Sequence, residues 1–235
     1  MHVLIIHTHS EADSFVSAMK NTIATEFAKQ SAEVTISDLY AMKFNPVLAP
    51  DDFGTRESPD HLNYALEQRH GFANKTIAAD IQEEIDKVIK ADILVFTFPL
   101  YWFSIPAILK GWIDRVFLSG PFYGGKRIYA EGGLRGKKAF VAFSLGGREH
   151  MFGPDAIHGE LATGMLRHFF QGMLGYVGLQ VYEPFIAYHV PYIDNALRVQ
   201  MLEELGQVVQ NLATRPFIPM PDLGKYDDKF RPKKP

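Results

Sequence analysis

The sequence predicts an α/β fold: a doubly wound parallel sheet with helices on both faces. Three short runs, residues 3–6, 93–98 and 138–145, are apolar almost throughout and rich in β-branched or aromatic side chains, as buried strands are. Strands without a polar face need cover on both sides, which parallel sheets provide. Segments with helical spacing of apolar residues lie between these runs, and this alternation is typical of α/β proteins.

The first forty residues predict a strand–helix–strand unit, which is nearly always parallel and right-handed. Residues 3–6 form its first strand and residues 33–39 its second. Either Asp13 or Ser14 can cap the helix between them. Apolar residues at every fourth position indicate that helix: Phe15, Met19, Ile23 and Phe27.

The remainder of the chain continues the alternation up to a tail. Residues 41–75 are rich in turn signals, and we expect a surface excursion there with a short helix near 63–69. The further expected elements are a helix over 76–90, a strand over 93–98 ended by Pro99, a helix opened by Ser104 and Pro106, a glycine-rich loop over 120–136, a strand over 138–145, a helix over 159–176, a strand over 180–188 and a helix over 194–213. Residues 1–213 are thus expected to be one domain and residues 214–235, with five prolines, an extended C-terminal tail.

Charge and composition exclude several classes of protein. The balance of 24 basic and 27 acidic side chains argues against nucleic-acid binding and against a polybasic membrane binder. The absence of cysteine excludes disulfides, thiolate metal sites and thiol nucleophiles. No apolar stretch has the length of a membrane span, no signal peptide is visible and the histidines form no metal signature. We therefore expect a cytoplasmic protein without stable membrane insertion or a bound metal.

Two catalytic motifs are approached but not matched. Residues 120–127 resemble a P-loop, yet Arg127 replaces the Ser or Thr that would hold magnesium, and no helix follows. Residues 144–146 lack the first glycine of a nucleophile elbow, and no G-x-G-x-x-G fingerprint follows a strand. The sequence gives no support to nucleotide hydrolysis or to serine hydrolase chemistry.

Function is expected in the loops 7–14, 99–105 and 144–158, because open parallel sheets bind ligands at the carboxyl ends of their strands. The first loop ends at a helix N-terminus, which favours an anion, and Ser14 adds a hydroxyl. The alternative is that Ser14 serves only as an N-cap.

In the second loop Tyr101, Trp102 and Phe103 follow an apolar strand, and this aromatic shelf suits a planar heteroaromatic ligand. The alternative there is a lid over the core or a subunit interface.

The third loop combines two glycines with a histidine. Gly146 and Gly147 allow a flat ring to approach the backbone, because no side chain intrudes. His158 is the group in this loop suited to proton transfer near neutral pH. The alternative for His158 is a structural residue at the start of a helix.

Together these segments resemble a known family. The chain is similar, from about residue 3 to residue 205, to the NAD(P)H:quinone oxidoreductases of the DT-diaphorase type, which are FAD enzymes with a flavodoxin-like fold. The segments that carry the resemblance are residues 14–20, 38–42, 98–103 and 106–112, Gly146-Gly147, and Ile157-His158-Gly159.

The resemblance implies roles for individual residues. It assigns to FAD binding His9, Ser14, Phe15, Val16, Asn63, Pro99, Leu100, Tyr101, Trp102, Phe103, Asp114, Ser144, Leu145, Gly146, Gly147 and Arg198. The positions of Asp114 and Arg198 favour FAD over the alternative, FMN. The resemblance assigns to the substrate pocket Trp102, Phe103, Tyr123, Ile128, Gly146, Gly147, Met151, Phe152 and His158, with part of it supplied by the second subunit of a homodimer. His158, Phe152 and Gly147 are the implied catalytic positions.

The implied reaction is a two-step hydride transfer with ping-pong kinetics, from NAD(P)H to the flavin and then to a quinone or a similar aromatic acceptor. One departure from the family pattern concerns Phe152, which stands where the family has a tyrosine and lacks the tyrosine hydroxyl.

Two alternative functions stay open. One is a flavin-binding ancillary subunit of a glutathione-gated potassium efflux system, and the other is an azo- or nitro-reductase. The sequence does not indicate a preference for NADH or NADPH.

Overall fold

The computed structural model describes residues 1–233 and is built on a parallel six-stranded sheet. The strand order is β2-β1-β3-β4-β5, and β6 also pairs with β4. All pairings are parallel, which confirms the predicted sheet. The strands are β1 (His2–His7), β2 (Glu33–Asp38), β3 (Ile93–Pro99), β4 (Lys138–Ser144), β5 (Gln180–Val181) and β6 (Phe185–Ala187).

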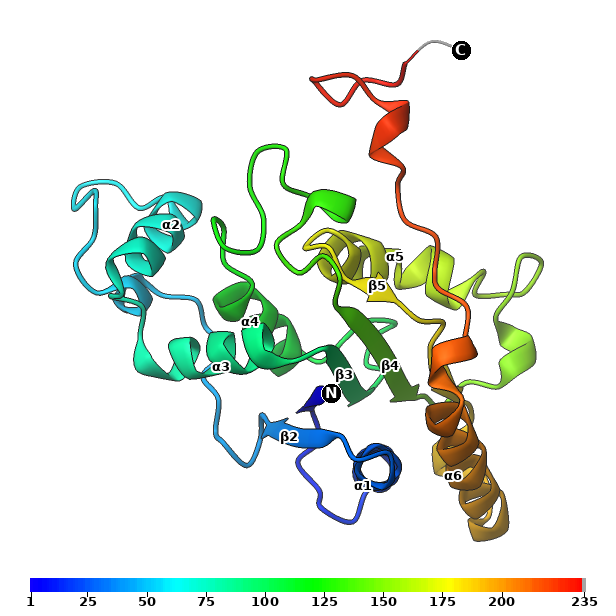
Figure 1. Ribbon diagram of the computed structural model, residues 1–235. Helices are drawn as coiled ribbons and strands as arrows, with labels where there is room; N and C mark the ends of the chain where they lie inside the picture. The colour runs from blue at the N-terminus through cyan, green and yellow to red at the C-terminus, as the bar shows by residue number, and fades with distance from the viewer. Residues whose placement is uncertain (234–235) are drawn as a thin grey trace.

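Helices cover both faces of the sheet (Figure 1). Along β1, Val3 and Ile5 belong to the core cluster beneath α1 (Phe15–Lys29) and α6 (Asn195–Gln210). Leu4 and Ile6 face the opposite cluster, beneath α3 (Ala79–Lys90) and α4 (Ala107–Val116). Successive strand residues therefore enter different layers, as the period of two requires. The helix α2 (Tyr64–Asn74) lies in the excursion between β2 and α3 and is longer than predicted.

Two predicted elements are wrong in detail. The helix expected over 159–176 is an irregular segment in which the short α5 (Arg167–Phe169) lies between π-helical turns at Leu161–Met165 and Phe170–Gly175. Glycines at 164, 172 and 175 weaken a regular helix there. The strand expected over 180–188 is split into β5 and β6, because Pro184 between them has no N–H to donate to a sheet.

The C-terminal tail runs along the molecule before extending away from it (Figure 1). Its first part is attached: Phe217 stacks on Tyr182 at 4.4 Å between ring centroids, and the N–H of Ile218 donates to the carbonyl of Val181 at 2.8 Å. A single helical turn follows at Leu223–Lys225. Residues 234–235 of the predicted tail lie outside the described residues.

The sheet brings three loops to one edge. β1 ends at His7, β3 at Pro99 and β4 at Ser144, and these strands are neighbours in the sheet. The chain leaves β1 for β2 on one side and later returns to β3 on the other, which makes this the switch point of the topology. The loops that follow the three strands therefore converge.

Candidate active site

A cleft of about 300 Å³, the cleft at the strand ends, opens where these loops meet. Each of the three loops contributes side chains or backbone to its wall. Ten residues of the predicted cofactor site line it: His9, Ser14, Phe15, Val16, Pro99, Leu100, Tyr101, Ser144, Leu145 and Gly146. Val190 and Pro191, from the segment after β6, complete the wall.

The start of α1 presents free backbone donors to the cleft. Ser14 caps the helix, since its hydroxyl accepts the N–H of Ser17 at 3.1 Å. Among the hydrogen bonds of residues 1–233, none takes up the N–H groups of Phe15 and Val16. Both residues line the cleft, so the helix end offers unpaired N–H donors to an anion bound there. Ser14 thus caps α1 and also lines the cleft.

The hydrogen bond made by His9 defines its proton-carrying nitrogen. Nδ1 of His9 accepts the N–H of Glu11 at 3.0 Å. In the neutral ring the proton must then be on Nε2. His9 therefore has one donor left for a ligand in the cleft that it lines.

A buried polar network supports the first loop from below. Nδ1 of His7 lies 2.8 Å from the hydroxyl of Thr97, and Nε2 lies 3.2 Å from that of Ser17. The Ser17 hydroxyl donates to the carbonyl of Glu11 and accepts from the hydroxyl of Ser14. Ser17 thus needs a proton on Nε2 of His7, and Thr97 donates to Nδ1. Burial, with the nearby Lys20, lowers the pKa of His7 from 6.5 to about 4, so the ring stays neutral.

The second loop is a two-residue turn with a strained backbone. Tyr101 and Ser104 exchange backbone hydrogen bonds of 3.0 and 2.9 Å around Trp102 and Phe103. Both central residues have positive φ, +50° and +55°, where side chains other than glycine are uncommon. Such strain is concentrated at functional sites.

The aromatic residues of this turn do not form one shelf inside the chain, which corrects the sequence interpretation. Tyr101 lines the cleft. Trp102 is 97% exposed, because the tip of a tight turn projects away from the strand end that carries it. Phe103 turns instead toward the third loop.

Phe103 meets Phe152 and His158 in an aromatic cluster. The ring of His158 lies 5.1 Å from that of Phe103 and 5.2 Å from that of Phe152, measured between centroids. Phe152 covers Gly147, since a Cβ on that glycine would lie 2.9 Å from the phenyl ring. The structure thus brings the three predicted catalytic positions, His158, Phe152 and Gly147, together beside the cleft. The backbone N–H of His158 donates to the carbonyl of Met151, which places Met151 in the same loop turn.

A second pocket of about 410 Å³ lies between α2 and α4 and is called the second pocket below. Asp114 and Tyr123 line it, and Asn63 caps α2 beside it by accepting the N–H of Leu66. Burial and the neighbouring Tyr176 raise the pKa of Tyr123. Within one chain these residues do not reach the cleft. The remaining predicted substrate residue, Ile128, is buried.

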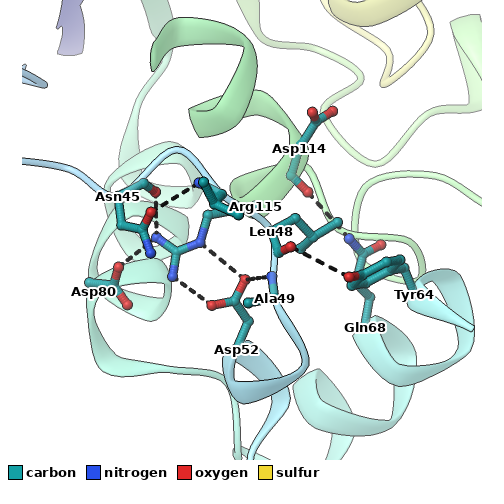
Figure 2. A network of polar contacts seen from close by, with 10 residues as sticks. Asn45, Leu48, Ala49, Asp52, Tyr64, Gln68, Asp80, Asp114 and Arg115 are labelled. Atoms are coloured by element: carbon teal, nitrogen blue, oxygen red, sulfur yellow. Dashed lines mark hydrogen bonds and ion pairs between the residues drawn. The ribbon is translucent and has the colours of Figure 1, made fainter. Parts of the chain in front are cut away.

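A polar network fixes one wall of the second pocket (Figure 2). Arg115, on α4 and 3% exposed, donates to both carboxylate oxygens of Asp52 and to Asp80. The same guanidinium donates to the carbonyl of Asn45 at 2.9 Å. The tyrosine hydroxyl of Tyr64 reaches the carbonyl of Leu48, and both residues line the pocket. The excursion after β2 is therefore attached to α4 through Arg115.

The segment after β6 forms a lip over the cleft that the sequence did not reveal. His189 has a positive φ of +58°, and its N–H donates to the carbonyl of Gly147 at 2.9 Å. Nη2 of Arg198 donates to the carbonyl of Val190 at 3.2 Å. Arg198 thus holds the lip from α6 rather than lining the cleft itself. No local pattern marks Val190 or Pro191, because their position depends on the break between β5 and β6.

Other kinds of site find no support in the described part of the chain. Residues 1–233 contain no group of three side chains arranged to hold a metal ion. Their helices include none with the length and apolar character needed to cross a bilayer.

The donors around the cleft fit a cofactor that carries phosphate and a flat ring. Bound phosphate oxygens would accept from the N–H groups of Phe15 and Val16, from Nε2 of His9 and from hydroxyls. Thr8, in the same loop, has a fully buried hydroxyl without a partner among the described residues. Gly146 also lines the cleft, and its N–H has no acceptor within residues 1–233. The N–H of Gly147 is likewise unpaired there, but this glycine lies under the ring of Phe152. A flavin nucleotide matches this donor set.

Comparison with known proteins gives a consistent result. A family model described as "Flavodoxin-like fold" matches residues 1–209. The chain is 37% identical over 210 residues to "NAD(P)H dehydrogenase [quinone] 1" of Cavia porcellus, covering 89% of this chain and 76% of that one. It is 36% identical over 220 residues to "Ribosyldihydronicotinamide dehydrogenase [quinone]" of Homo sapiens, covering 92% of this chain and 94% of that one.

A solved structure described as a putative quinone reductase from Klebsiella pneumoniae superimposes with a TM-score of 0.91 at 33% identity, covering 96% of this chain and 91% of that one. Fold, sequence and structural likeness agree over nearly the whole chain. The chain therefore belongs to the flavodoxin-like family of NAD(P)H:quinone oxidoreductases.

Proposed function

We propose that this protein is an FAD-dependent NAD(P)H:quinone oxidoreductase. The observation that carries the proposal is the convergence, in one cleft, of Phe15 and Val16, whose N–H groups are unpaired within residues 1–233, with the backbone of Gly146. The names of the relatives support a reduced nicotinamide as donor and a quinone as acceptor. FAD is proposed over FMN on the family positions of Asp114 and Arg198.

The residues divide the work between two ends of the cleft. Ser14, Phe15, Val16 and His9 bind the phosphates, while Tyr101, Leu145 and Gly146 hold the ring. When bound, the flavin supplies two-electron redox chemistry between donor and acceptor. His158 lies beside the ring end and stabilises negative charge there or supplies a proton. Phe152 and Phe103 pack against the ring of His158 and orient it.

We further propose that two copies of the chain build each site. In this arrangement Asn63, Asp114 and Tyr123 of one copy, at the second pocket, close the cleft of the other. Trp102, which is 97% exposed in one chain and follows Tyr101 of the cleft wall, then leaves solvent at the contact between the two copies. Residues 1–213 constitute the flavin-binding domain in this proposal, with the tail outside it.

The first experiment compares flavin binding by two N-cap variants. Ser14→Ala and Asp194→Ala each remove the cap of a long helix, α1 and α6, and each should destabilise the fold by about 1 kcal/mol. Only Ser14→Ala should weaken the affinity for FAD, which is measured by titrating the apoprotein with FAD. Mass spectrometry of the cofactor released from the purified protein identifies the flavin. Equal affinities for FAD in both variants, or a chain that binds no flavin at all, would refute the proposed site.

The second experiment tests the reaction. The holoenzyme should reduce quinones with parallel double-reciprocal lines, and His158→Gln should slow anaerobic reduction of the flavin while leaving it bound. Intersecting lines would argue against one shared site for donor and acceptor. A flavin that is bound but never reduced by NAD(P)H would favour an ancillary role over catalysis.

A further inference from the structure

The glycine-rich segment 120–127 forms a hairpin instead of a phosphate-binding P-loop. The N–H of Gly120 donates to the carbonyl of Tyr123 at 2.7 Å, and Gly124 and Arg127 exchange backbone hydrogen bonds of 3.3 and 3.0 Å. The two residues at its tip are Gly125, with a φ of +58°, and Lys126. The backbone donors of Gly120, Gly124 and Arg127 are thus engaged within the hairpin, and the side chains of Lys126 and Arg127 are the charged groups that can meet a ligand.

Cationic side chains surround this hairpin. Arg127 donates from Nη1 to the carbonyl of Gly120 at 2.8 Å, so its guanidinium is fixed against the hairpin. Arg69 reaches over from α2, held at Ser119, and a Cβ on Gly124 would lie 3.2 Å from its Nη2. A groove of about 480 Å³ runs between Lys126 and Arg127 on one side and residues 131–135 on the other, where Arg135 adds a third lining cation.

Two carboxylates offset part of this charge. Asp228 of the tail pairs with Lys126 at 2.6 Å, and Glu131 pairs with Arg135 at 3.2 Å. Arg69 and Arg127 have no carboxylate partner within residues 1–233. The groove therefore keeps an excess of positive charge, and one of its cations is held by a tail residue that is 95% exposed.

The same hairpin also lines the second pocket. Tyr123, three residues before Lys126, contributes to that pocket together with residues of α2, of α4 and of the segment 172–177. A ligand whose ring occupies the pocket can thus extend toward the cations of the hairpin. The hairpin thus contributes residues both to a site for a flat group and to a site for an anion, although no residue lines both.

We propose that the groove formed by Lys126, Arg127 and Arg135, together with Arg69, binds the phosphates of the reduced nicotinamide donor. The donor is then a phosphate-bearing dinucleotide, preferably the 2′-phosphorylated form, rather than an uncharged dihydronicotinamide riboside. The names of the relatives include both kinds of donor, so the fold alone does not decide between a dinucleotide and a riboside. This inference rests on the proposed oxidoreductase function and specifies its substrate.

The location of the cations suits a donor that must leave after each turnover. They are on an exposed hairpin, where water and salt screen their charges and binding remains weak. The flavin phosphates are assigned to the cleft, so the groove is free for the second nucleotide.

The test measures KM and kcat of the flavin-loaded enzyme for NADPH, NADH and dihydronicotinamide riboside. The variant Lys126→Gln/Arg127→Gln should raise KM by about tenfold for NADPH, by less for NADH, and within error not at all for the riboside, because each donor carries fewer phosphate charges than the one before. The kcat values should stay unchanged. The matched control is Lys29→Gln/Lys90→Gln, which removes two exposed lysines at the amino edge of the sheet and should leave all three KM values unchanged.

A second variant changes affinity in the opposite direction. Asp228→Asn frees Lys126 and should lower KM for NADPH by about twofold, an effect that added salt should remove. Asp228 is exposed and touches neither pocket, so this variant is expected to fold.

The outcomes separate the two proposals. Equal KM changes in the hairpin variant and its control, or equal changes for NADPH and the riboside, would overturn the phosphate groove while leaving the oxidoreductase intact. Preferred turnover of the riboside by the unmodified enzyme would overturn it too. Failure of all three donors to reduce the flavin would instead refute the proposed function itself.

Discussion

At the scale of single residues, local pattern identified the donors around the cleft but not the residue that supports them. Ser14 and its neighbours follow from the polar stretch that precedes an amphipathic helix. His7 belongs by pattern to a buried strand. Its role appears only when Thr97, 90 residues away, and Ser17 are placed on either side of its ring.

His7 makes the stability of the fold depend on pH. Its pKa is 6.5 in the unfolded chain and about 4 in the folded chain, so the unfolded state binds a proton first as the pH falls. The free energy of unfolding should therefore decrease between pH 6.5 and pH 4, by about 2 kcal/mol at pH 5.

Urea unfolding at pH 7 and pH 5 measures this change, and His7→Gln should remove about that part of the difference. His2→Gln is the control, because His2, at the start of the same strand, is half-exposed and lies outside the network of His7. An identical pH dependence in both variants and the parent would contradict the role of His7.

At the scale of elements, regular helices and strands followed from their periodicity, whereas irregular ones did not. Helices such as α1 and α3 form where apolar residues recur at helical spacing. The excursion after β2 has no such period. Its path is fixed by α4, where a Cβ on Gly111 would lie 2.1 Å from the carbonyl oxygen of Pro46, and by the Arg115 network one turn further (Figure 2).

Removal of the Arg115 guanidinium should detach this excursion. Arg115→Leu leaves the carboxylate of Asp52 buried without its partner and should lower the free energy of unfolding by about 3–5 kcal/mol. Asp80→Asn breaks only the half-exposed contact and should lower it by less than about 1 kcal/mol.

Urea denaturation of both variants checks this difference. Arg115→Lys keeps the charge without the bidentate contact, and we expect an intermediate value. Equally small losses in all three variants would show that the network does not hold the excursion.

At the scale of the whole molecule, the predicted site residues fall into two groups that one chain does not bring together. The cleft collects the residues that follow β1, β3 and β4, whereas Asp114 and Tyr123 lie at the second pocket. Our proposal joins the two groups through a homodimer of twice the 26.5 kDa of the chain.

Complementation between inactive variants tests this assembly. A variant with a damaged cleft, Ser14→Ala/His158→Gln, and one with a damaged second pocket, Tyr123→Ala, should each have low quinone reductase activity. After unfolding and refolding together with flavin, half of the dimers are mixed and each holds one intact site, so about one quarter of the parental activity should return.

Sedimentation velocity of the same samples measures the mass of the assembly. Refolding each variant alone provides the control. A monomeric mass, or a mixture no more active than the separate variants, would refute sites shared between two copies.

The sequence by itself determined the parallel sheet, its covering helices and the three loops in which a ligand site had to lie. These features depend on apolar periodicity and turn chemistry within short windows, which any segment displays without its neighbours. Only the tertiary structure decided that Trp102 projects outward, that Asp114 and Tyr123 line a separate pocket, and that Lys126, Arg127 and Arg135 share a groove. Those outcomes depend on contacts between residues far apart in the chain, where packing and hydrogen bonding, rather than local propensity, determine the position of each side chain.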